Sequence, residues 1–483
     1  MSETSTTSFK KSLNLFDSTA IVMGSMIGSG IFIVSADMSR VLGAPGWLII
    51  AWAITGVLTL FAALSYGELA AMMPNAGGQY VYLRESYNSL TGFLYGWTLF
   101  LVIQTGTIAA VGMAFAKFSG VVFPGISESR TLLDLGFLKI STVHIVAILM
   151  IFFLTWFNSR GIRTGKYIQN SFTYLKAFIL LIFIIGGFWL ASNLKAIELN
   201  KAVFWNAVST SKAGVITSLS GFALIAALGI SQVGSLFTSD AWNNITFTAG
   251  EVVNPKKNIP LSLFIGTLAV TIIYILINFV YLQALPLRGD PHGASVFERG
   301  IQFATNDRLG TATIYSLFGE SAAVLMAIFI IISTFGCNNG IILSGARVYY
   351  AMANDNLFFK QVGKLNKNGV PGTGLYVQAI WASLLCLSGT YSQLLDYVVF
   401  AVLIFYVLTI GGLFILRIRK PDADRPYKAF GYPVVPAVYI LLALFIMAIL
   451  LIYKPTYTWP GLIIVLTGIP VYYIWKNFLN KTE

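Results

Sequence analysis

The sequence predicts an all-α polytopic membrane protein with about twelve transmembrane helices. Of its 483 residues, 57% are hydrophobic and only 10% are charged, and the mean hydropathy is +0.77. Soluble globular domains carry about 25% charged residues, so this chain is not suited to water on all sides. Apolar runs of about 20 residues, enough for a helix to cross a ~30 Å hydrocarbon core, recur along the whole sequence.

The predicted spans follow these apolar runs. Their approximate limits are 16–41, 47–73, 89–118, 143–158, 168–191, 214–245, 260–285, 319–352, 374–391, 394–418, 433–453 and 458–477. An even number of spans places both termini on the same side of the membrane, and most lysines and arginines of the connections fall on that side. By the positive-inside rule, both termini of this multi-pass cell-membrane protein are expected to be cytoplasmic.

Composition also argues against several other classes of protein. The net charge is +12, but no basic cluster has the density typical of a nucleic-acid-binding surface, so no nucleic acid partner is expected. Cys337 and Cys386 lie in apolar runs, and His144 and His292 are isolated. These residues predict neither a disulfide framework nor a metal site, and no cofactor is expected. The polar first eighteen residues, with no small-residue cleavage site after the first apolar run, argue against a cleaved signal peptide.

The first span contains an unusual cluster of glycines, in the stretch MGSMIGSGIFIV. Glycine costs a helix roughly 1 kcal/mol relative to alanine. Gly28 and Gly30 allow the backbone dihedrals that a break requires, and they let another group approach the main chain closely. A break in a membrane helix is tolerated where it lines a cavity. The N–H groups that open the second half-helix carry about half a positive charge and suit a carboxylate, while the carbonyls of Met26 and Ile27 suit an ammonium. One broken helix can therefore bind both backbone ends of an amino acid.

Two other interpretations compete with a binding site. Gly24 and Gly28 have the spacing of a small-residue helix-packing motif. A dinucleotide-binding loop is less suitable, because the spacing is wrong and no strand precedes it. A second interruption, GSLFTSDAWNN, places Asp240 within the sixth span. Interruptions in the first and sixth spans are typical of a five-plus-five inverted repeat with a central site, so we favour the binding site.

Several motifs resemble those of a known transporter superfamily. The first region contains GSMIGSGIF and GAPGWLIIAWAITGVLTLFAALSYGELAAMMPNAGGQYVYLRESY; later regions contain LFTSDAWNN, GEVVNPKKNIP, ISTFGCNNG, GARVYYAMA and RPYKAFGYPVVP. In this order they resemble the amino acid–polyamine–organocation superfamily, and within it the L-type amino acid transporter family. The resemblance implies inverted repeats of helices 1–5 and 6–10, with helices 1 and 6 unwound. The expected division is an N-terminal tail (1–14), a ten-helix core (15–420, with repeats at about 15–192 and 213–420), helices 11 and 12 (421–477) and a C-terminal tail (478–483).

The resemblance also implies a substrate site at the two breaks. Main-chain N–H groups would bind the substrate carboxylate at Gly28, Ser29 and Gly30. The α-amino group would meet the carbonyls of Met26 and Phe237 and the main chain near Ser239 and Asp240. Phe237 would close over the substrate as a gate, with Trp242 and Asn243 at the following gate positions. The sequence departs from many relatives at Thr238, Ser239 and Asp240, which leaves the identity of the substrate open.

The partner of the animal relatives is not expected for this chain. In those proteins a cysteine between helices 3 and 4 forms a disulfide with a glycoprotein heavy chain. Residues 119–142 contain no cysteine. The resemblance therefore implies a stand-alone member of prokaryotic type, whose partners are small-molecule amino acid substrates and the lipid bilayer.

Lys176 lies well inside the fifth span, where a charge at the bilayer centre costs ~2.5–3.5 kcal/mol. It could extend to the interface. The resemblance instead places it where sodium-coupled relatives bind a sodium ion between helices 1, 5 and 8. Its ammonium would then hold carbonyls of the broken first helix and a hydroxyl of Ser333 or Thr334, which implies transport without sodium.

Three acidic residues complete the set of candidates. Asp240 could pair with the substrate ammonium, take up a proton during transport, or stabilise the break. Glu68 and Glu251 end the second span and follow the sixth, near basic residues. We expect them to form structural or inner-gate ion pairs.

These features favour a sodium-independent carrier that exchanges neutral L-amino acids by alternating access. The alternative within the same fold is a symporter that couples uptake to a proton through Lys176 or Asp240. A membrane-embedded enzyme is a remote alternative, because the sequence has no HExxH motif and no serine–histidine constellation. A channel is disfavoured because paired broken helices are typical of carriers.

Overall fold

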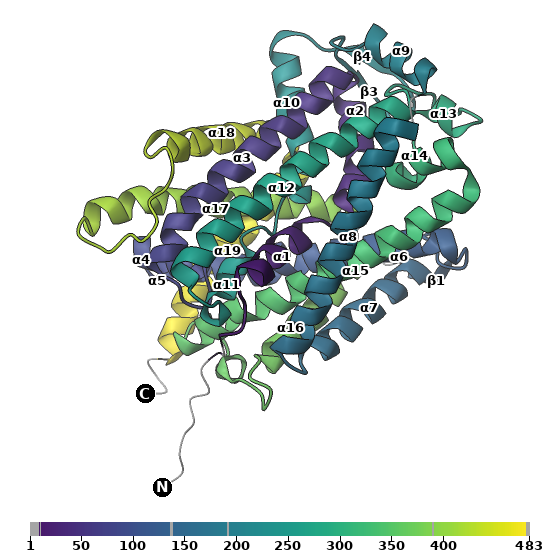
Figure 1. The fold of residues 1–483 in the computed structure, drawn as a ribbon. Helices are drawn as coiled ribbons and strands as arrows, with labels where there is room; N and C mark the ends of the chain where they lie inside the picture. Colours follow the sequence, from purple (N-terminus) through teal and green to yellow (C-terminus); the bar gives the residue numbers. More distant parts are fainter. Residues whose placement is uncertain (1–8, 10, 136–138, 191–192, 389–390, 480–483) are drawn as a thin grey trace.

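The computed structural model describes residues 9, 11–135, 139–190, 193–388 and 391–479. Within them, ten helical segments are long and apolar enough to cross a membrane. These segments run side by side as one bundle (Figure 1). The protein is thus an all-α polytopic membrane protein, as predicted. The predicted tails at 1–14 and 478–483 lie partly outside the described residues.

The first five predicted spans all correspond to helices. In order they are α1 (Leu15–Met26) with the 3-10 helix η1 (Gly30–Phe32) and α2 (Val34–Leu42); α3 (Pro45–Met72); α5 (Ser89–Thr98), the π-helical η2 (Leu99–Ile103) and α6 (Gln104–Val122); α7 (Thr142–Asn158); and α8 (Ile162–Leu190). A short helix, α4 (Gln79–Ser86), connects the second and third spans. α7 has 17 residues and is shorter than the ten long segments.

The remaining seven spans are also helical. They are α10 (Gly221–Thr238) with α11 (Asn244–Phe247) and η3 (Ala249–Glu251); α12 (Pro255–Ala284); α15 (Glu320–Asn354); α16 (Gly372–Ser388); α17 (Tyr391–Arg419); α18 (Val434–Tyr453); and α19 (Pro455–Leu479). The predicted start of the sixth span at residue 214 was wrong. Residues 216–218 pair with 208–210 as strands, which commits their backbone groups, and the helix begins at Gly221.

The structure adds two short hairpins that the all-α prediction lacks. Strand β1 (Thr131–Asp134) pairs with β2 (Lys139–Ser141), and β3 (Val208–Thr210) with β4 (Ile216–Ser218), both antiparallel. Short helices complete the connections: α9 (Leu194–Ala202), α13 (Val296–Arg299), η4 (Thr305–Asp307), α14 (Leu309–Phe318) and η5 (Lys360–Gly363). In Figure 1, α9, β3, β4 and α13 gather at one end of the bundle. There the β3–β4 hairpin satisfies backbone hydrogen bonds of the connecting segment.

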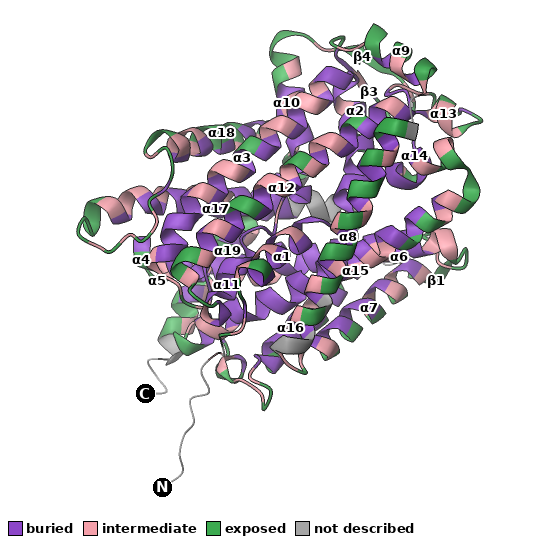
Figure 2. Ribbon diagram, in the orientation of Figure 1, coloured by how far each residue is buried: buried purple, intermediate pink, exposed green. Residues whose placement is uncertain are grey.

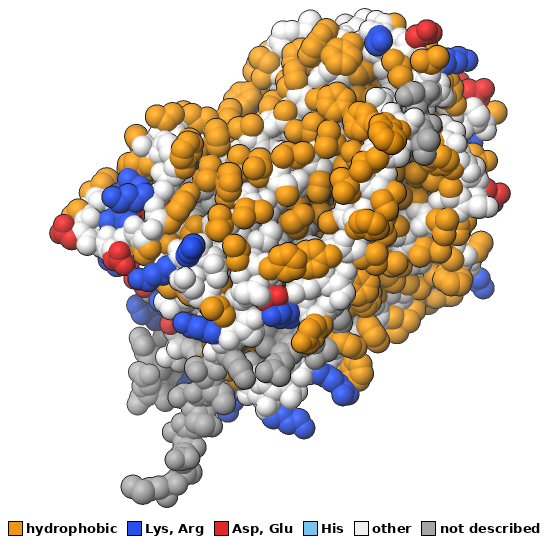
Figure 3. Space-filling view, in the orientation of Figure 1, with side chains coloured by type: hydrophobic (Ala, Val, Ile, Leu, Met, Phe, Trp, Pro, Cys, Tyr) orange, Lys and Arg blue, Asp and Glu red, His pale blue; other side chains and the backbone are white. Residues whose placement is uncertain are grey.

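The surface of the bundle is suited to lipid. Figure 3 shows hydrophobic side chains over the middle of the visible face and most charged side chains towards its two ends. The helix α8 illustrates the cause: Phe178, Leu181 and Ile185 are exposed, whereas Lys176 and Leu180 are buried. Figure 2 shows the same division, with exposed positions along the outside of α8 and buried residues in the centre of the bundle. A helix of this pattern presents one face to the bundle and the other to acyl chains.

The two acidic residues predicted to form ion pairs do so, at the end of the bundle where α1 begins. Glu251 lies 2.9 Å from Nε of Arg347, and both side chains are buried. The carbonyl of Glu251 accepts hydrogen bonds from the backbone N–H groups of Ser12 and Leu13. The segment before α1 is therefore attached to the end of the second helix break.

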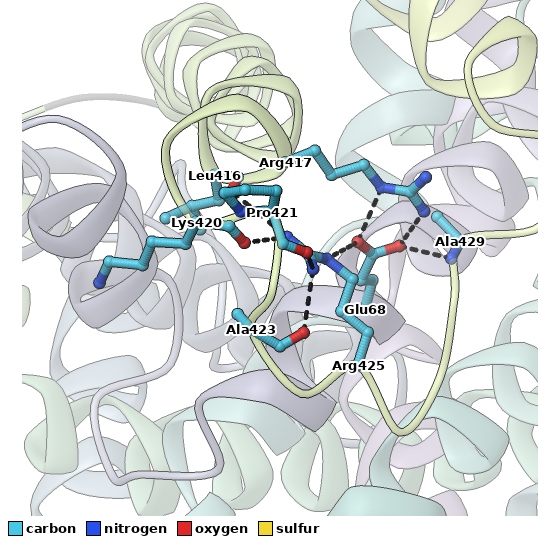
Figure 4. A network of polar contacts seen from close by, with 8 residues as sticks. All are labelled: Glu68, Leu416, Arg417, Lys420, Pro421, Ala423, Arg425 and Ala429. Atoms are coloured by element: carbon cyan, nitrogen blue, oxygen red, sulfur yellow. Dashed lines mark hydrogen bonds and ion pairs between the residues drawn. The ribbon is translucent and has the colours of Figure 1, made fainter.

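Glu68 is the centre of a larger network (Figure 4). Its two oxygens accept hydrogen bonds from Arg417 at 2.9 and 2.6 Å, and one also accepts from the backbone N–H of Ala429 at 2.7 Å. Arg425 lies 3.3 Å away, and its guanidinium also donates to carbonyls of the loop after α17. The fully buried Glu68 thus ties this loop to α3.

We expect Glu68→Gln to destabilise the protein markedly. Removing one partner of a buried ion pair costs ~3–5 kcal/mol, although the partial exposure of Arg417 reduces this cost. The matched control is Glu85→Gln, because Glu85 pairs with Arg84 and Lys420 at the surface, where such pairs are worth ~0–1 kcal/mol. Thermal unfolding in detergent measures the difference. Equal melting temperatures for the two variants would show that the network does not stabilise the fold.

Candidate functional site

The first helix break lies at the predicted position. α1 ends at Met26, Ile27 is extended (φ −75°, ψ 92°), and helical structure resumes at Gly30. Among the residues that the structure describes, the N–H groups of Gly28 and Gly30 form no backbone hydrogen bond. These two N–H groups are buried and are not engaged by a main-chain carbonyl of the described residues. They are therefore suited to bind an anionic ligand.

One of the two predicted reasons for the glycines is wrong. Neither Gly28 nor Gly30 has a positive φ, so the break does not depend on dihedrals reserved for glycine. The other predicted reason, close approach to the main chain, explains them. A Cβ on Gly28 would lie 2.9 Å from Sγ of Cys337 in α15, and a Cβ on Gly30 would overlap the side chain of Thr238. Glycine at these positions lets neighbouring helices contact the main chain of the break.

The second break meets the first. α10 ends at Thr238, Ala241 adopts a left-handed conformation (φ 64°), and α11 begins at Asn244. The contact between Gly30 and Thr238 brings the two breaks together. Two interrupted helices that lie against each other provide main-chain donors and acceptors at a single place inside the bundle.

Tyr274 joins the two breaks and was missed by the sequence analysis. Its hydroxyl lies 2.9 Å from the carbonyl of Met26 and 3.2 Å from that of Thr238. The side chain is buried in the middle of α12. The sequence does not distinguish a tyrosine with this role from the many aromatic residues that only pack within apolar helices.

The carbonyl groups assigned to the substrate ammonium have different surroundings. The Met26 oxygen lies against the Tyr274 hydroxyl, and the Phe237 oxygen accepts from the N–H of Asp240 at 3.2 Å. The Ile27 oxygen accepts from Lys176 at 2.6 Å and from Ser333 at 3.4 Å. Both lone pairs of the Ile27 carbonyl are therefore engaged. This departs from the prediction that Ile27 offers its carbonyl to a substrate.

Lys176 joins α8 to the first break. Its Nζ donates to the carbonyls of Gly24 at 2.5 Å and Ile27 at 2.6 Å, and the side chain is fully buried. The lysine thus points into the bundle and does not extend to the interface. Of the two predicted hydroxyl partners, Ser333 meets Lys176 at the shared Ile27 carbonyl, whereas Thr334 donates to carbonyls of its own helix.

Asp240 lies between two small cavities. Its Oδ1 accepts a hydrogen bond of 2.5 Å from the hydroxyl of Tyr406 in α17. Each cavity has a volume of about 20 Å³ and is lined in part by Asp240 and Tyr406. That volume holds about one water molecule. An amino acid therefore requires the surrounding helices to move before it can bind beside Asp240.

Two of the three predicted gate residues, Trp242 and Asn243, line these cavities. Phe237 is buried in the last turn of α10, which ends at Thr238, and Ser239 is the C-cap residue of that helix. The ring of Trp242 contacts those of Tyr66 and Tyr406, with centroids 4.8 and 5.3 Å apart.

Asn243 connects this region to α4. Its side-chain amide donates to Gln79 at 2.9 Å, and Gln79 in turn donates to Thr409 in α17. The second break is thereby linked to both α4 and α17. The buried Ser29 lies between the two glycines of the first break.

Within the described residues, no three His, Cys, Asp or Glu side chains are grouped to hold a metal ion. His144 instead caps α7, with Nδ1 3.0 Å from the N–H of Ser141. This is the structural role that an isolated histidine most often has.

Comparison with known proteins agrees with the geometry. The model of the family described as amino acid permease matches residues 13–474. The b(0,+)-type amino acid transporter 1 of Mus musculus is 27% identical over 484 aligned residues, which cover 99% of this chain and 90% of that protein. The large neutral amino acids transporter small subunit 2 of Rattus norvegicus is 28% identical over 480 residues, which cover 98% of this chain and 82% of that protein. The chain therefore belongs to the amino acid permease family of the amino acid–polyamine–organocation superfamily, as its motifs indicated.

Proposed function

We propose that this protein is a sodium-independent exchanger of neutral L-amino acids that works by alternating access. The observation that carries the proposal is the meeting of two broken helices at Gly30 and Thr238 in an amino acid permease. One relative is named for large neutral amino acids. No catalytic chemistry is required of these groups, because main-chain donors and acceptors suffice to bind and release a zwitterion.

In the proposed complex, the N–H groups of Gly28, Ser29 and Gly30 bind the substrate carboxylate. The carbonyls of Met26 and Phe237 accept hydrogen bonds from the α-amino group. At Met26 the substrate ammonium replaces the hydroxyl of Tyr274 as the donor. The substrate side chain then lies towards Ser239 and Asp240. This assignment is supported by the unbonded N–H groups of Gly28 and Gly30 among the described residues.

The position of Lys176 supports the proposed sodium independence. Its ammonium already occupies the carbonyls of Gly24 and Ile27. A sodium ion at the same oxygens would be adjacent to a fixed positive charge, and like charges at such distances repel strongly in a buried site. We therefore expect equal uptake in sodium and potassium buffers.

Alternating access would move the helices of one repeat against those of the other around this site. The proposed repeats are residues 15–192 and 213–420, with both termini in the cytoplasm and the protein in the cell membrane. We also propose that it acts without a disulfide-linked heavy chain, since residues 119–142 contain no cysteine. Phe237, Trp242 and Asn243 would form the gate.

Proton symport is the second candidate, and the buried position of Asp240 favours it. The described residues include no ion pair of Asp240 with a base, and Tyr406 donates to it at 2.5 Å. For an exchanger, an inward proton gradient should not accelerate uptake into liposomes without internal amino acid. Acceleration in the wild type that is lost in Asp240→Asn would establish symport.

A competition assay in liposomes tests the substrate class. One labelled neutral amino acid is exchanged in the presence of each standard amino acid in excess. We expect neutral L-amino acids to compete and acidic and basic ones not to do so. Small neutral competitors would indicate an alanine–serine–cysteine exchanger, and large ones a leucine–phenylalanine carrier. Equal competition by lysine or arginine would contradict neutral specificity.

A further inference from the structure

A groove of about 880 Å³ lies on the outside of the bundle, away from the helix breaks. It is bounded by the last part of α3, the first part of α12 and the loop before α18. Its apolar walls consist of Leu60, Phe61, Leu64, Leu261, Phe264 and Phe430. Phe430 is 69% exposed and Phe264 is 37% exposed, so these rings face the surroundings of the protein.

Three lysines stand at the same groove. Lys256 and Lys257 belong to the first turn of α12, and Lys428 belongs to the loop. All three are exposed. Lys256 pairs with the exposed Asp424 at 3.0 Å, whereas Lys257 and Lys428 form no ion pair with any described residue. The N-terminus of α12 adds a partial positive charge.

The wall formed by the loop is fixed in place from behind. Tyr427 packs against Gly67, where a Cβ would lie 2.7 Å from its ring. The N–H of Ala429 donates to Glu68 in the network of Figure 4. A preformed groove loses less conformational freedom when it binds a ligand.

We propose that this groove binds an anionic phospholipid, with an acyl chain along the apolar walls and the phosphate beside Lys257 and Lys428. The combination of exposed aromatic rings and unpaired lysines fits this chemistry, since basic pockets between membrane helices bind anionic head groups. Figure 3 shows Lys and Arg side chains gathered at the left of the molecule, next to hydrophobic surface. A soluble anion would make no contact with the apolar walls. A zwitterionic lipid carries a positive charge beside its phosphate, which weakens its attraction to the unpaired lysines.

Native mass spectrometry of the detergent-purified protein tests the proposal. Phosphatidylglycerol should bind more tightly than phosphatidylcholine with the same acyl chains. Each lysine near an anionic lipid contributes about a factor of five. The double variant Lys257→Gln, Lys428→Gln should therefore weaken phosphatidylglycerol binding roughly 25-fold. The control Lys364→Gln, Lys367→Gln removes the same charge from exposed positions in the loop between α15 and α16, and should bind as the wild type does.

A second variant tests the apolar wall. Phe430→Ser removes an exposed ring and should fold normally, but it should bind phosphatidylglycerol more weakly while all lysines remain. Equal binding by the two double variants, or equal binding of both lipids to the wild type, would overturn the proposal. Displacement of phosphatidylglycerol by inorganic phosphate, together with normal binding by Phe430→Ser, would instead show a site for a soluble anion.

Discussion

Gly30→Val is expected to abolish transport while a monodisperse protein remains. A valine side chain at this position would overlap Thr238, the last residue of α10. It would also stand between a substrate carboxylate and the main-chain N–H groups of the break. Uptake into liposomes by the purified variant measures transport, and size-exclusion chromatography measures whether the variant is monodisperse. Near-normal uptake by monodisperse variant would remove the argument for a carboxylate site.

Two matched variants separate the steric effect from the binding effect. Gly24→Val introduces the same side chain one turn earlier, where it would meet Thr173 and Gln169 of α8. We expect it to lower expression more than substrate affinity. Gly30→Ala combined with Thr238→Gly relieves the contact with α10 but leaves a methyl group at the break. Full recovery of transport in that double variant would assign Gly30 to packing alone.

Lys176→Ala should slow transport strongly and change substrate affinity less. Its removal leaves the carbonyl of Gly24 without the ammonium and that of Ile27 with only the weak bond from Ser333. An unsatisfied buried group costs ~1–3 kcal/mol. About 1.4 kcal/mol is enough for a tenfold change in the equilibrium between two conformations. The variant should therefore populate mainly one of the inward- and outward-facing conformations.

The measurement is exchange in liposomes together with equilibrium binding in detergent. Thr173→Val is the control, because Thr173 lies one turn before Lys176 and donates to Ala20 of α1, away from the break. It should leave the exchange rate nearly unchanged. Normal exchange by Lys176→Ala, or a sodium requirement in the wild type, would show that the lysine does not replace a sodium ion.

The fold itself could be predicted from the sequence. A bilayer requires each span to be apolar over about 20 residues, so the twelve helices were visible as runs of hydrophobic residues. The interruption at Gly28 and Gly30 and that near Asp240 were visible for the same reason, since small and polar residues break such runs. The start of α10 was misplaced because residues 216–218 form a short strand that pairs with residues 208–210, and composition does not separate a short strand from a helix end.

The sequence by itself determined the helical class, the two breaks and the residues near them. Tertiary structure alone decided which groups meet there. Tyr274 bridges Met26 and Thr238, Lys176 and Ser333 share the carbonyl of Ile27, and Gly30 lies against Thr238. These contacts join helices that are far apart in the chain. Periodicity reports which face of a helix is buried, but the partner across that face depends on how whole helices pack.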